Sequence, residues 1–429
     1  MDNPIKKTLS GNKGICSVCS ANKHVITAAL RHAKKNGSIL LIEATSNQVN
    51  QYGGYLGLTP AAFVEEVREL ARKEDFQIEN LVLGGDHIGP YPWRNLDYGV
   101  AMENAEELVR AYVEAGFTKI HIDTSMCLAG DDRIGGTGLE LIAERSARLA
   151  SVVYKTFNKS RATHAKAVRP VLVVGSEVPV PGGSVVYEDR VSPTKAEVFN
   201  QSVCVFRESF DRMQVPWDDV VAFVVQPGVE FGDDFIIPYS RESASELCAQ
   251  LKDHAGMVFE GHSTDYQPLK CLRDMVIDGI KILKVGPELT FTLREALLQL
   301  LHIERILDGS QDGQNETDIL KALLDAMNKD TKNWESYYAG TPEEIEFKKI
   351  YSFSDRCRYY LNEAAVEKTI GNLIADLRKK KIPLALLSQY MPKQYEKIIN
   401  GYLRPDVWDL VYDRIMDVLD RYLCACGGV

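Results

Sequence analysis

The feature that most constrains the fold is an alternation of eight short apolar runs with helix-like stretches over about the first 300 residues. The apolar runs cover residues 14–19, 39–43, 81–83, 119–123, 171–175, 220–225, 257–260 and 280–285. Strands that alternate with helices predict a parallel sheet, and eight such units favour a closed (β/α)8 TIM barrel. The competing open, doubly wound sheet would require a glycine-rich G-x-G-x-x-G turn after an early strand, and the sequence has none.

The pattern changes near Ser310, where the polar segment SQDGQNETD begins. Amphipathic helical segments follow at 319–327, 343–351, 366–380 and 407–423, without a further buried β-like run. We therefore expect a barrel over residues 1–309 and a helical C-terminal region over 310–429 that packs on it.

Composition excludes several classes of partner. The chain has 429 residues and a net charge of -10, without a basic tract, so nucleic acid is not an expected partner. No apolar run approaches the roughly 18 residues that span a bilayer, so we expect no membrane association. The first residues lack the apolar core of a signal peptide, which predicts a cytoplasmic protein. The nine cysteines lie mostly in apolar segments, which favours packing over metal binding or disulfides.

Groups that ionise or hydrogen-bond strongly follow the predicted strands where each strand ends. They are Glu43 and Asn47, Asp86 and His87, Asp123, Glu177, Gln226 and Glu230, His262, Ser263 and Asp265, and Lys284 and Gly286. A single such group could be a helix cap or one side of an internal ion pair, most readily Asp123 or Asp265. Because the active sites of barrels of this kind lie at the carboxyl ends of the strands, the whole set predicts a catalytic site.

Burying several acids near one barrel mouth is unfavourable unless a cation neutralises them. His87, Glu177 and His262 could supply two imidazoles and a carboxylate to one divalent metal and leave positions open for substrate. Asp86 could then move a proton. Lys284 could be a Schiff-base nucleophile, but an ion pair with a barrel acid or a phosphate contact is favoured, since a metal would make a Schiff base redundant.

The loops after strands seven and eight commonly hold phosphate in such barrels. Ser263, Gly286 and the helix that begins near Glu288 are positioned for that role.

Ten segments in order along the chain resemble the GatZ/KbaZ family of tagatose-bisphosphate aldolase accessory subunits and their ketohexose-phosphate 4-epimerase relatives. They are GICSVCSAN (14–22), LIEATSNQVNQYGGY (41–55), LGGDHIGP (83–90), KIHIDTSM (119–126), GSEVPVPGG (175–183), VVQPGVEF (224–231), GHSTDYQ (261–267), LKVGPELTF (283–291), SDRCRYY (354–360) and LLSQYMPKQ (386–394). The resemblance covers essentially the whole chain.

The resemblance implies a (β/α)8 barrel similar to the metal-dependent class II aldolases. In those enzymes a strand ends in an Asp-His pair, which implies an acid/base role for Asp86 and a metal-binding role for His87. A histidine after a glycine on strand seven corresponds to His262. The remaining metal histidine of the aldolases has no obvious counterpart, and Glu177 lies in the corresponding region. Family members are either non-catalytic partners of an aldolase subunit or enzymes themselves.

We interpret the chain as a metal-dependent epimerase that interconverts tagatose 6-phosphate and fructose 6-phosphate at C4. The alternative is a non-catalytic stabilising subunit of a class II tagatose-1,6-bisphosphate aldolase. A kinase would require a G-x-x-x-x-G-K-[ST] loop, which is absent. The expected partners are a phosphorylated ketohexose and either a catalytic aldolase subunit or further copies of this chain.

Each expected site residue has a role in this interpretation. We expect catalytic roles for Asp86, Glu230, Asp123 and Lys284, substrate contacts from Glu43, Asn47, Gln226, Ser263, Asp265 and Gly286, and metal ligation by His87, Glu177 and His262. The expected cofactor is one divalent ion, first Zn²⁺, with Mn²⁺, Ni²⁺ or Co²⁺ as alternatives.

Overall fold

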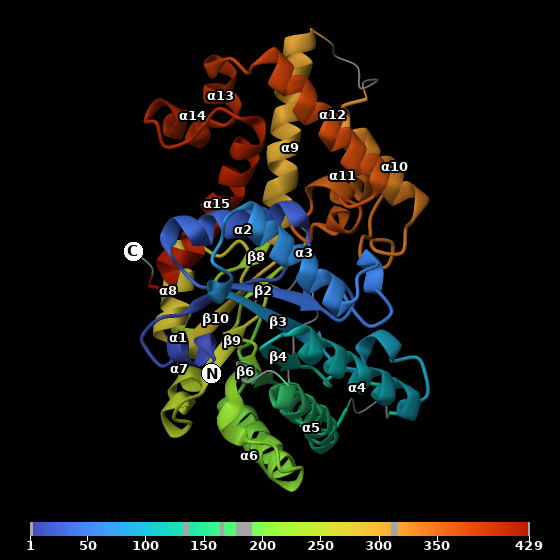
Figure 1. Ribbon diagram of the computed structural model, residues 1–429, viewed down its shortest axis with the longest axis vertical. Coiled ribbons are helices and arrows are strands. Elements are labelled where there is room, and N and C mark those ends of the chain that lie inside the picture. Colours follow the sequence, from blue (N-terminus) through green and yellow to red (C-terminus); the bar gives the residue numbers. More distant parts are fainter. Residues whose placement is uncertain (1–2, 132–136, 164–166, 177–190, 310–315, 428–429) are drawn as a thin grey trace.

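Eight parallel strands form a closed barrel, which confirms the predicted fold class (Figure 1). This computed structural model describes residues 3–131, 137–163, 167–176, 191–309 and 316–427. Around the barrel the strands are β1 (Ile15–Val18), β10 (Ile280–Val285), β9 (Val258–Gly261), β6 (Val220–Val225), β5 (Val171–Val174), β4 (Lys119–Ile122), β3 (Leu81–Ile88) and β2 (Leu40–Thr45). Strands β7 (Glu230–Phe231) and β8 (Ile236–Ile237) form a separate antiparallel pair.

Helices surround the barrel and extend beyond it. The α-helices are α1 (Pro4–Leu9), α2 (Lys23–Asn36), α3 (Pro60–Lys73), α4 (Tyr98–Ala115), α5 (Leu139–Thr163), α6 (Ala196–Arg212), α7 (Arg241–Ala249), α8 (Leu269–Ile277), α9 (Pro287–Asp308), α10 (Ile319–Lys329), α11 (Pro342–Tyr351), α12 (Ala364–Lys380), α13 (Leu384–Tyr390), α14 (Pro392–Ile399) and α15 (Val407–Ala425). Single turns of 3₁₀ helix are η1 (Gly54–Leu56), η2 (Ile78–Asn80), η3 (Tyr91–Trp93), η4 (Trp217–Asp219), η5 (Gln250–Asp253) and η6 (Arg356–Tyr359). No helix in the described ranges is long and apolar enough to cross a membrane.

Helix α1, which the sequence analysis did not predict, packs into the apolar interior at the N-terminal end of the barrel. Its buried residues Ile5 and Leu9 join a cluster of inward-facing valines and isoleucines from the strands. The Asn3 side chain caps the helix and donates hydrogen bonds to the backbone carbonyls of Thr118 and Arg169, which precede β4 and β5. This end of the barrel is therefore apolar and closed.

Four buried charged side chains lie inside the barrel: Glu43, Lys119, Glu260 and Lys284. We call these four residues the charged layer. Lys119 Nζ is 2.6 Å from a carboxylate oxygen of Glu43 and 2.6 Å from one of Glu260. Gly84 on β3 leaves the room that Glu43 needs, because a Cβ there would lie 2.8 Å from Glu43 Cγ. Opposite charges at this distance offset much of the cost of removing each group from water.

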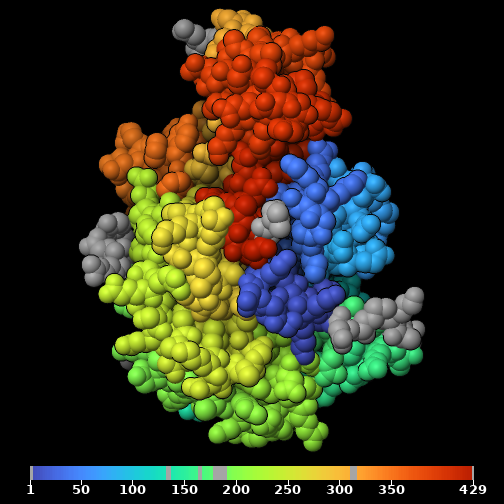
Figure 2. Space-filling view, turned by 90° about the vertical axis from the view of Figure 1, so that its left-hand side faces the viewer, coloured from blue at the N-terminus to red at the C-terminus, as the bar shows by residue number. Residues whose placement is uncertain are grey.

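The C-terminal region is helical, as predicted, and its helices pack on α9 and on helices of the barrel. Helix α9 extends away from the barrel, α10 and α12 pack beside it, and α15 returns to pack against α2, α8 and α9 (Figure 1). Figure 2 shows this last helix, in red, between the N-terminal segment in blue and a yellow segment. The Gly14 amide donates a hydrogen bond to the Cys426 carbonyl at 3.1 Å, so the end of α15 reaches the start of β1.

We predict that Lys119→Met strongly destabilises the protein, because it removes one of two buried cations and leaves Glu43 and Glu260 to share Lys284 with Asp86. Removing one partner of a buried ion pair typically costs about 3–5 kcal/mol. Urea unfolding at pH 7 measures this loss. The control is Lys270→Met, since Lys270 is a highly exposed lysine paired with Asp274, and exposed pairs contribute about 0–1 kcal/mol.

We also predict that the stability difference between wild type and Lys119→Met depends on pH. Burial opposes the ionisation of Glu260, but Lys119 and Lys284 outweigh burial and hold the pKa of Glu260 well below its usual value. A carboxyl with a depressed folded-state pKa stabilises the fold above its unfolded pKa, and this contribution is lost as the pH falls through the folded pKa. The difference between wild type and Lys119→Met should therefore be largest near neutral pH and narrow below about pH 4. A constant difference from pH 7 to pH 3 would contradict the assignment.

Candidate functional site

A cavity of about 110 Å³ lies at the carboxyl ends of the barrel strands, and we call it the mouth cavity. The barrel contributes Asp86, His87, His262 and Lys284 to its lining, and the C-terminal region contributes two residues of η6. A larger, mostly apolar cavity of about 370 Å³ lies between α2, α15 and the start of β1, but it contains none of these four residues. The smaller cavity is therefore the candidate site.

Strand β3 is irregular where it enters the site. Its pairing with β4 shifts register between Gly85 and Ile88. His87 has a backbone φ of 48°, a conformation that residues other than glycine rarely adopt. The Ser46 hydroxyl stabilises this turn of the backbone by donating to the His87 carbonyl at 2.9 Å. Neighbouring side chains of a regular strand point to opposite faces, whereas this irregularity brings both Asp86 and His87 to the same group of side chains.

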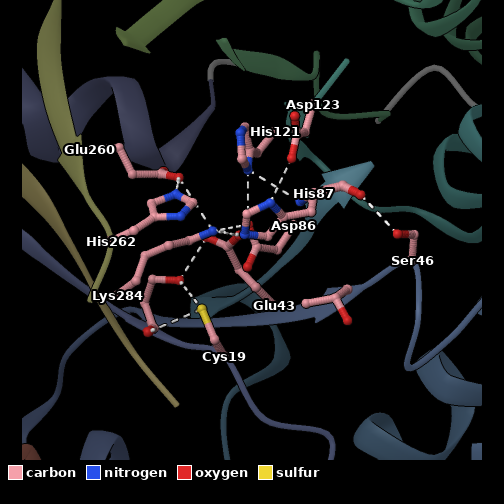
Figure 3. A network of polar contacts seen from close by, with 12 residues as sticks. Cys19, Glu43, Ser46, Asp86, His87, His121, Asp123, Glu260, His262 and Lys284 are labelled. Atoms are coloured by element: carbon pink, nitrogen blue, oxygen red, sulfur yellow. Dashed lines mark hydrogen bonds and ion pairs between the residues drawn. The ribbon is translucent and has the colours of Figure 1, made fainter. Parts of the chain in front are cut away.

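His87, His121 and His262 come together at this point, and we call them the histidine cluster (Figure 3). Their ring centroids are 5.0 Å apart for His87 and His121, 5.0 Å for His87 and His262, and 5.2 Å for His121 and His262. One nitrogen of each ring and one oxygen of Asp86 all lie within 4.8 Å of one another. Such a group could hold a divalent cation.

Each ring of the histidine cluster has one nitrogen beside a carboxylate. His87 Nδ1 lies 2.8 Å from Asp123, and His262 Nε2 lies 3.0 Å from Glu260. His121 Nδ1 lies 2.9 Å from Asp86. Carboxylates that hold one imidazole nitrogen orient the other nitrogen, and metal-binding histidines typically have such partners.

The second nitrogen of His121 supports the fit to a cation. His121 is fully buried, and its Nε2 has no hydrogen-bond partner in the part of the chain that the structure describes. A buried polar atom without a partner is unfavourable, and a metal ion would satisfy it. Burial and the nearby Lys284 lower the pKa of His262 to about 3, which keeps this imidazole neutral, the form that binds metal.

Lys284 forms ion pairs with barrel acids, as the ion-pair alternative predicts, and its expected catalytic role stays a prediction. Its ammonium contacts Asp86 and lies 3.2 Å from Glu43 and 3.3 Å from Glu260. Burial opposes the charge of Asp86, but His87 and Lys284 outweigh burial and hold the pKa of Asp86 well below its ordinary value. Asp86 is therefore a carboxylate in this site.

The sequence analysis missed His121, although it placed the residue in the strand KIHID. The alternation of that strand puts Lys119, His121 and Asp123 on one face, which was the available signal. Asp123, expected in catalysis, holds His87 and also accepts a hydrogen bond from the Ser125 hydroxyl at 2.7 Å. The expected ligand Glu177 lies outside the described residues.

The other expected residues divide into two groups. Asn47, Ser263, Asp265 and Gly286 line the mouth cavity. Gln226, Glu230 and Glu43 are not part of its described lining. Gln226 Oε1 accepts hydrogen bonds from the Gly228 and Val229 amides, Glu230 Oε1 accepts one from the Phe231 amide, and Glu43 belongs to the charged layer.

Asp265 acts as a cap at the N-terminus of α9. Its Oδ1 accepts hydrogen bonds from the amides of Gly286 and Glu288, both at 2.9 Å. Burial and the neighbouring Glu288 raise the pKa of Asp265 to about 7. These two backbone amides, which could otherwise donate hydrogen bonds to a phosphate, are thus already paired with a side chain of the protein.

Comparison with known proteins agrees with this architecture. The family model for the D-tagatose-1,6-bisphosphate aldolase subunit GatZ/KbaZ-like matches residues 2–427. A crystal structure of a probable tagatose 6 phosphate kinase from Sinorhizobium meliloti 1021 is similar with a TM-score of 0.87 and 39% sequence identity, over 96% of this chain and 100% of that chain.

Two aldolases are much more distant. The YdjI aldolase from Escherichia coli K12 has a TM-score of 0.39 and 12% identity over 89% of this chain and 100% of that chain. Fructose-bisphosphate aldolase from Campylobacter jejuni has a TM-score of 0.42 and 14% identity over 88% of this chain and 92% of that chain. At these values neither carries an argument about function.

The match of the family model over nearly the whole chain shows that the protein belongs to the GatZ/KbaZ-like family of D-tagatose-1,6-bisphosphate aldolase subunits.

Proposed function

We propose that this protein is a metal-dependent ketohexose-phosphate 4-epimerase that interconverts tagatose 6-phosphate and fructose 6-phosphate. The observation that carries the proposal is the histidine cluster beside an ionised, cavity-lining Asp86. The sugar class is supported by the family description, which names tagatose 1,6-bisphosphate, and by the name of the Sinorhizobium meliloti relative, which contains tagatose 6 phosphate.

The residues that would hold the metal are His87, His121 and His262. This set adds His121 to the two histidines expected from the sequence, while the expected ligand Glu177 lies outside the described residues and stays a prediction. Three imidazole nitrogens suit Zn²⁺ first, while Mn²⁺, Ni²⁺ and Co²⁺ remain alternatives. A divalent cation held there would supply stabilisation of the negative charge that develops on the substrate carbonyl oxygen.

The chemistry of C4 favours an aldol route. The hydrogen on C4 is not α to the C2 carbonyl, so enolisation cannot invert that carbon. Deprotonation of the C4 hydroxyl allows the C3–C4 bond to break, and its electron pair passes to C3 and the C2 carbonyl as an enediolate. The aldehyde fragment turns over, the enediolate adds to its other face, and the new C4 oxygen takes the proton back.

Asp86 is the residue that we assign to the proton on the C4 hydroxyl. It is a carboxylate that lines the mouth cavity and contacts the histidine cluster. The ammonium of Lys284 and the imidazole of His121 hold this carboxylate in position. A base that is fixed by two partners needs little reorganisation before it accepts a proton.

The alternative function is that of a non-catalytic stabilising subunit of a class II aldolase. The family description favours it, since it names an aldolase subunit. A purely structural role does not require a buried imidazole nitrogen without a partner or an ionised carboxylate in a cavity. The assay that separates the two functions uses the purified chain alone.

We expect that His121→Ala loses the bound divalent metal, because it removes a fully buried imidazole whose Nε2 has no hydrogen-bond partner in the described residues. Metal content is measured by mass spectrometry after dialysis against a Zn²⁺ solution. The control is His302→Ala, which changes a histidine on α9 that contacts Tyr390 and lies outside the cluster. If both His121→Ala and His87→Ala retain the wild-type metal content, the metal site is wrongly assigned.

We expect that Asp86→Asn retains metal and fold while turnover falls by about 10²- to 10⁴-fold, the usual contribution of general acid–base catalysis. The purified chain is incubated with tagatose 6-phosphate and a divalent metal, and fructose 6-phosphate is quantified. Glu230→Gln is the comparison, since Glu230 is the second candidate. Turnover of Asp86→Asn within a factor of a few of wild type would remove Asp86 from the mechanism. Absence of turnover by the metal-loaded wild type, combined with stabilisation of an aldolase, would favour the accessory function.

A further inference from the structure

We infer that Arg358, from the C-terminal region, binds the phosphate group of the substrate in the mouth cavity. This inference rests on the proposed function and deepens it, because it assigns a residue to the phosphate group of the ketose phosphate. It rests on the charge balance of the cavity, on the groups that position Arg358, and on the occupied N-terminus of α9.

The first argument is charge. One lysine and one arginine line the described cavity, Lys284 and Arg358. Lys284 is surrounded by three carboxylates and is therefore neutralised. In the described ranges Arg358 forms no ion pair with a carboxylate, and the acid nearest in sequence, Asp355, pairs with Arg294 at 3.2 Å. Arg358 is thus the cation available to a ligand.

The second argument is preorganisation. Arg358 Nη1 donates to the carbonyls of Ser354 and Asp355, and Nη2 donates to the Tyr359 hydroxyl at 3.0 Å. The guanidinium carbon lies 4.5 Å from the centre of the Tyr359 ring. Of the five N–H groups of a guanidinium, these contacts use three. A planar cation held in this way, with donors remaining, is suited to bind phosphate through two parallel hydrogen bonds.

The turn that carries Arg358 is fixed to the barrel. Asp355 accepts a hydrogen bond from the Thr290 hydroxyl at 2.6 Å and pairs with the buried Arg294, both on α9. The Tyr266 hydroxyl, in the loop after β9, donates to the Phe353 carbonyl at 2.7 Å. These buried contacts hold η6 at a set position relative to β9 and β10.

The third argument concerns the usual phosphate position in such barrels, the loops after the last two strands. The Asp265 carboxylate already accepts hydrogen bonds from the two amides at the start of α9, and Glu288 lies beside it. A phosphate there would meet two acidic side chains. The Arg358 guanidinium, on the same cavity, offers the opposite charge.

The contact between Arg358 and phosphate would have a function in the aldol route. Cleavage of a 6-phosphorylated ketose between C3 and C4 leaves the phosphate on the aldehyde fragment. A phosphate held by Arg358 retains that fragment in the cavity while its carbonyl turns over. Without the anchor, the aldehyde escapes before the C–C bond re-forms.

Binding measured without turnover tests the inference. Inorganic phosphate, fructose 6-phosphate and fructose are titrated calorimetrically into the Zn²⁺-loaded full chain and into Arg358→Gln, Arg358→Lys and Arg404→Gln. Arg404 is the control because it is a mostly exposed arginine paired with Asp409. We expect Arg358→Gln to weaken fructose 6-phosphate and inorganic phosphate by roughly 10- to 100-fold and to leave fructose unchanged. Arg358→Lys should lie between, since an ammonium keeps the charge but not the fork of donors.

Equal affinity of wild type and folded Arg358→Gln for fructose 6-phosphate would overturn the inference, as would a wild type that binds fructose 6-phosphate no more tightly than fructose. Should Arg358→Gln not fold by circular dichroism, Arg358→Lys decides, and wild-type affinity in that variant overturns the inference. Failure of the epimerase proposal is a different outcome, because phosphate binding that depends on Arg358 would persist in a chain that shows no turnover.

Discussion

The structure depends on a balance of charge in the interior of the barrel. Two buried lysines, Lys119 and Lys284, lie among the carboxylates of Glu43, Glu260 and Asp86. None of these groups would be stable there alone, since an unpaired buried charge costs several kcal/mol. The pairing also has a directional consequence, because two of the carboxylates use their remaining capacity to hold rings of the histidine cluster. The network that makes the interior stable therefore also orients the site.

Much of the barrel could be predicted from sequence because most strand residues are buried, so that strands such as β5 and β6 appear as continuous apolar runs. The runs at 220–225 and 280–285 coincide with β6 and β10. Helix α1 could not be predicted in the same way, because six residues are too few to show helical periodicity. The irregularity at His87 depends on pairing with β4 and on the Ser46 hydrogen bond, which are tertiary contacts.

The candidate site was predictable where its residues follow strand ends, as Asp86 and His262 do. His121 lies within a strand, and a search confined to strand ends passes over it. Arg358 reaches the cavity from a turn more than 70 residues beyond the last barrel strand, through contacts between segments distant in sequence. The local sequence pattern carries no information on such contacts. The sequence alone therefore predicts the barrel residues of this site but not the residue from the C-terminal region.

The return of α15 to the barrel has a consequence for the order of folding. All eight barrel strands have been synthesised by Val285, but the faces of α2 and α8 that α15 covers stay exposed until that helix leaves the ribosome. Domains tend to fold as units during synthesis, and apolar surface left open in the interval promotes aggregation. The nascent barrel must therefore wait about 140 residues, from Val285 to Ala425, or roughly 7–28 s at typical elongation rates, until the helix that covers it is complete.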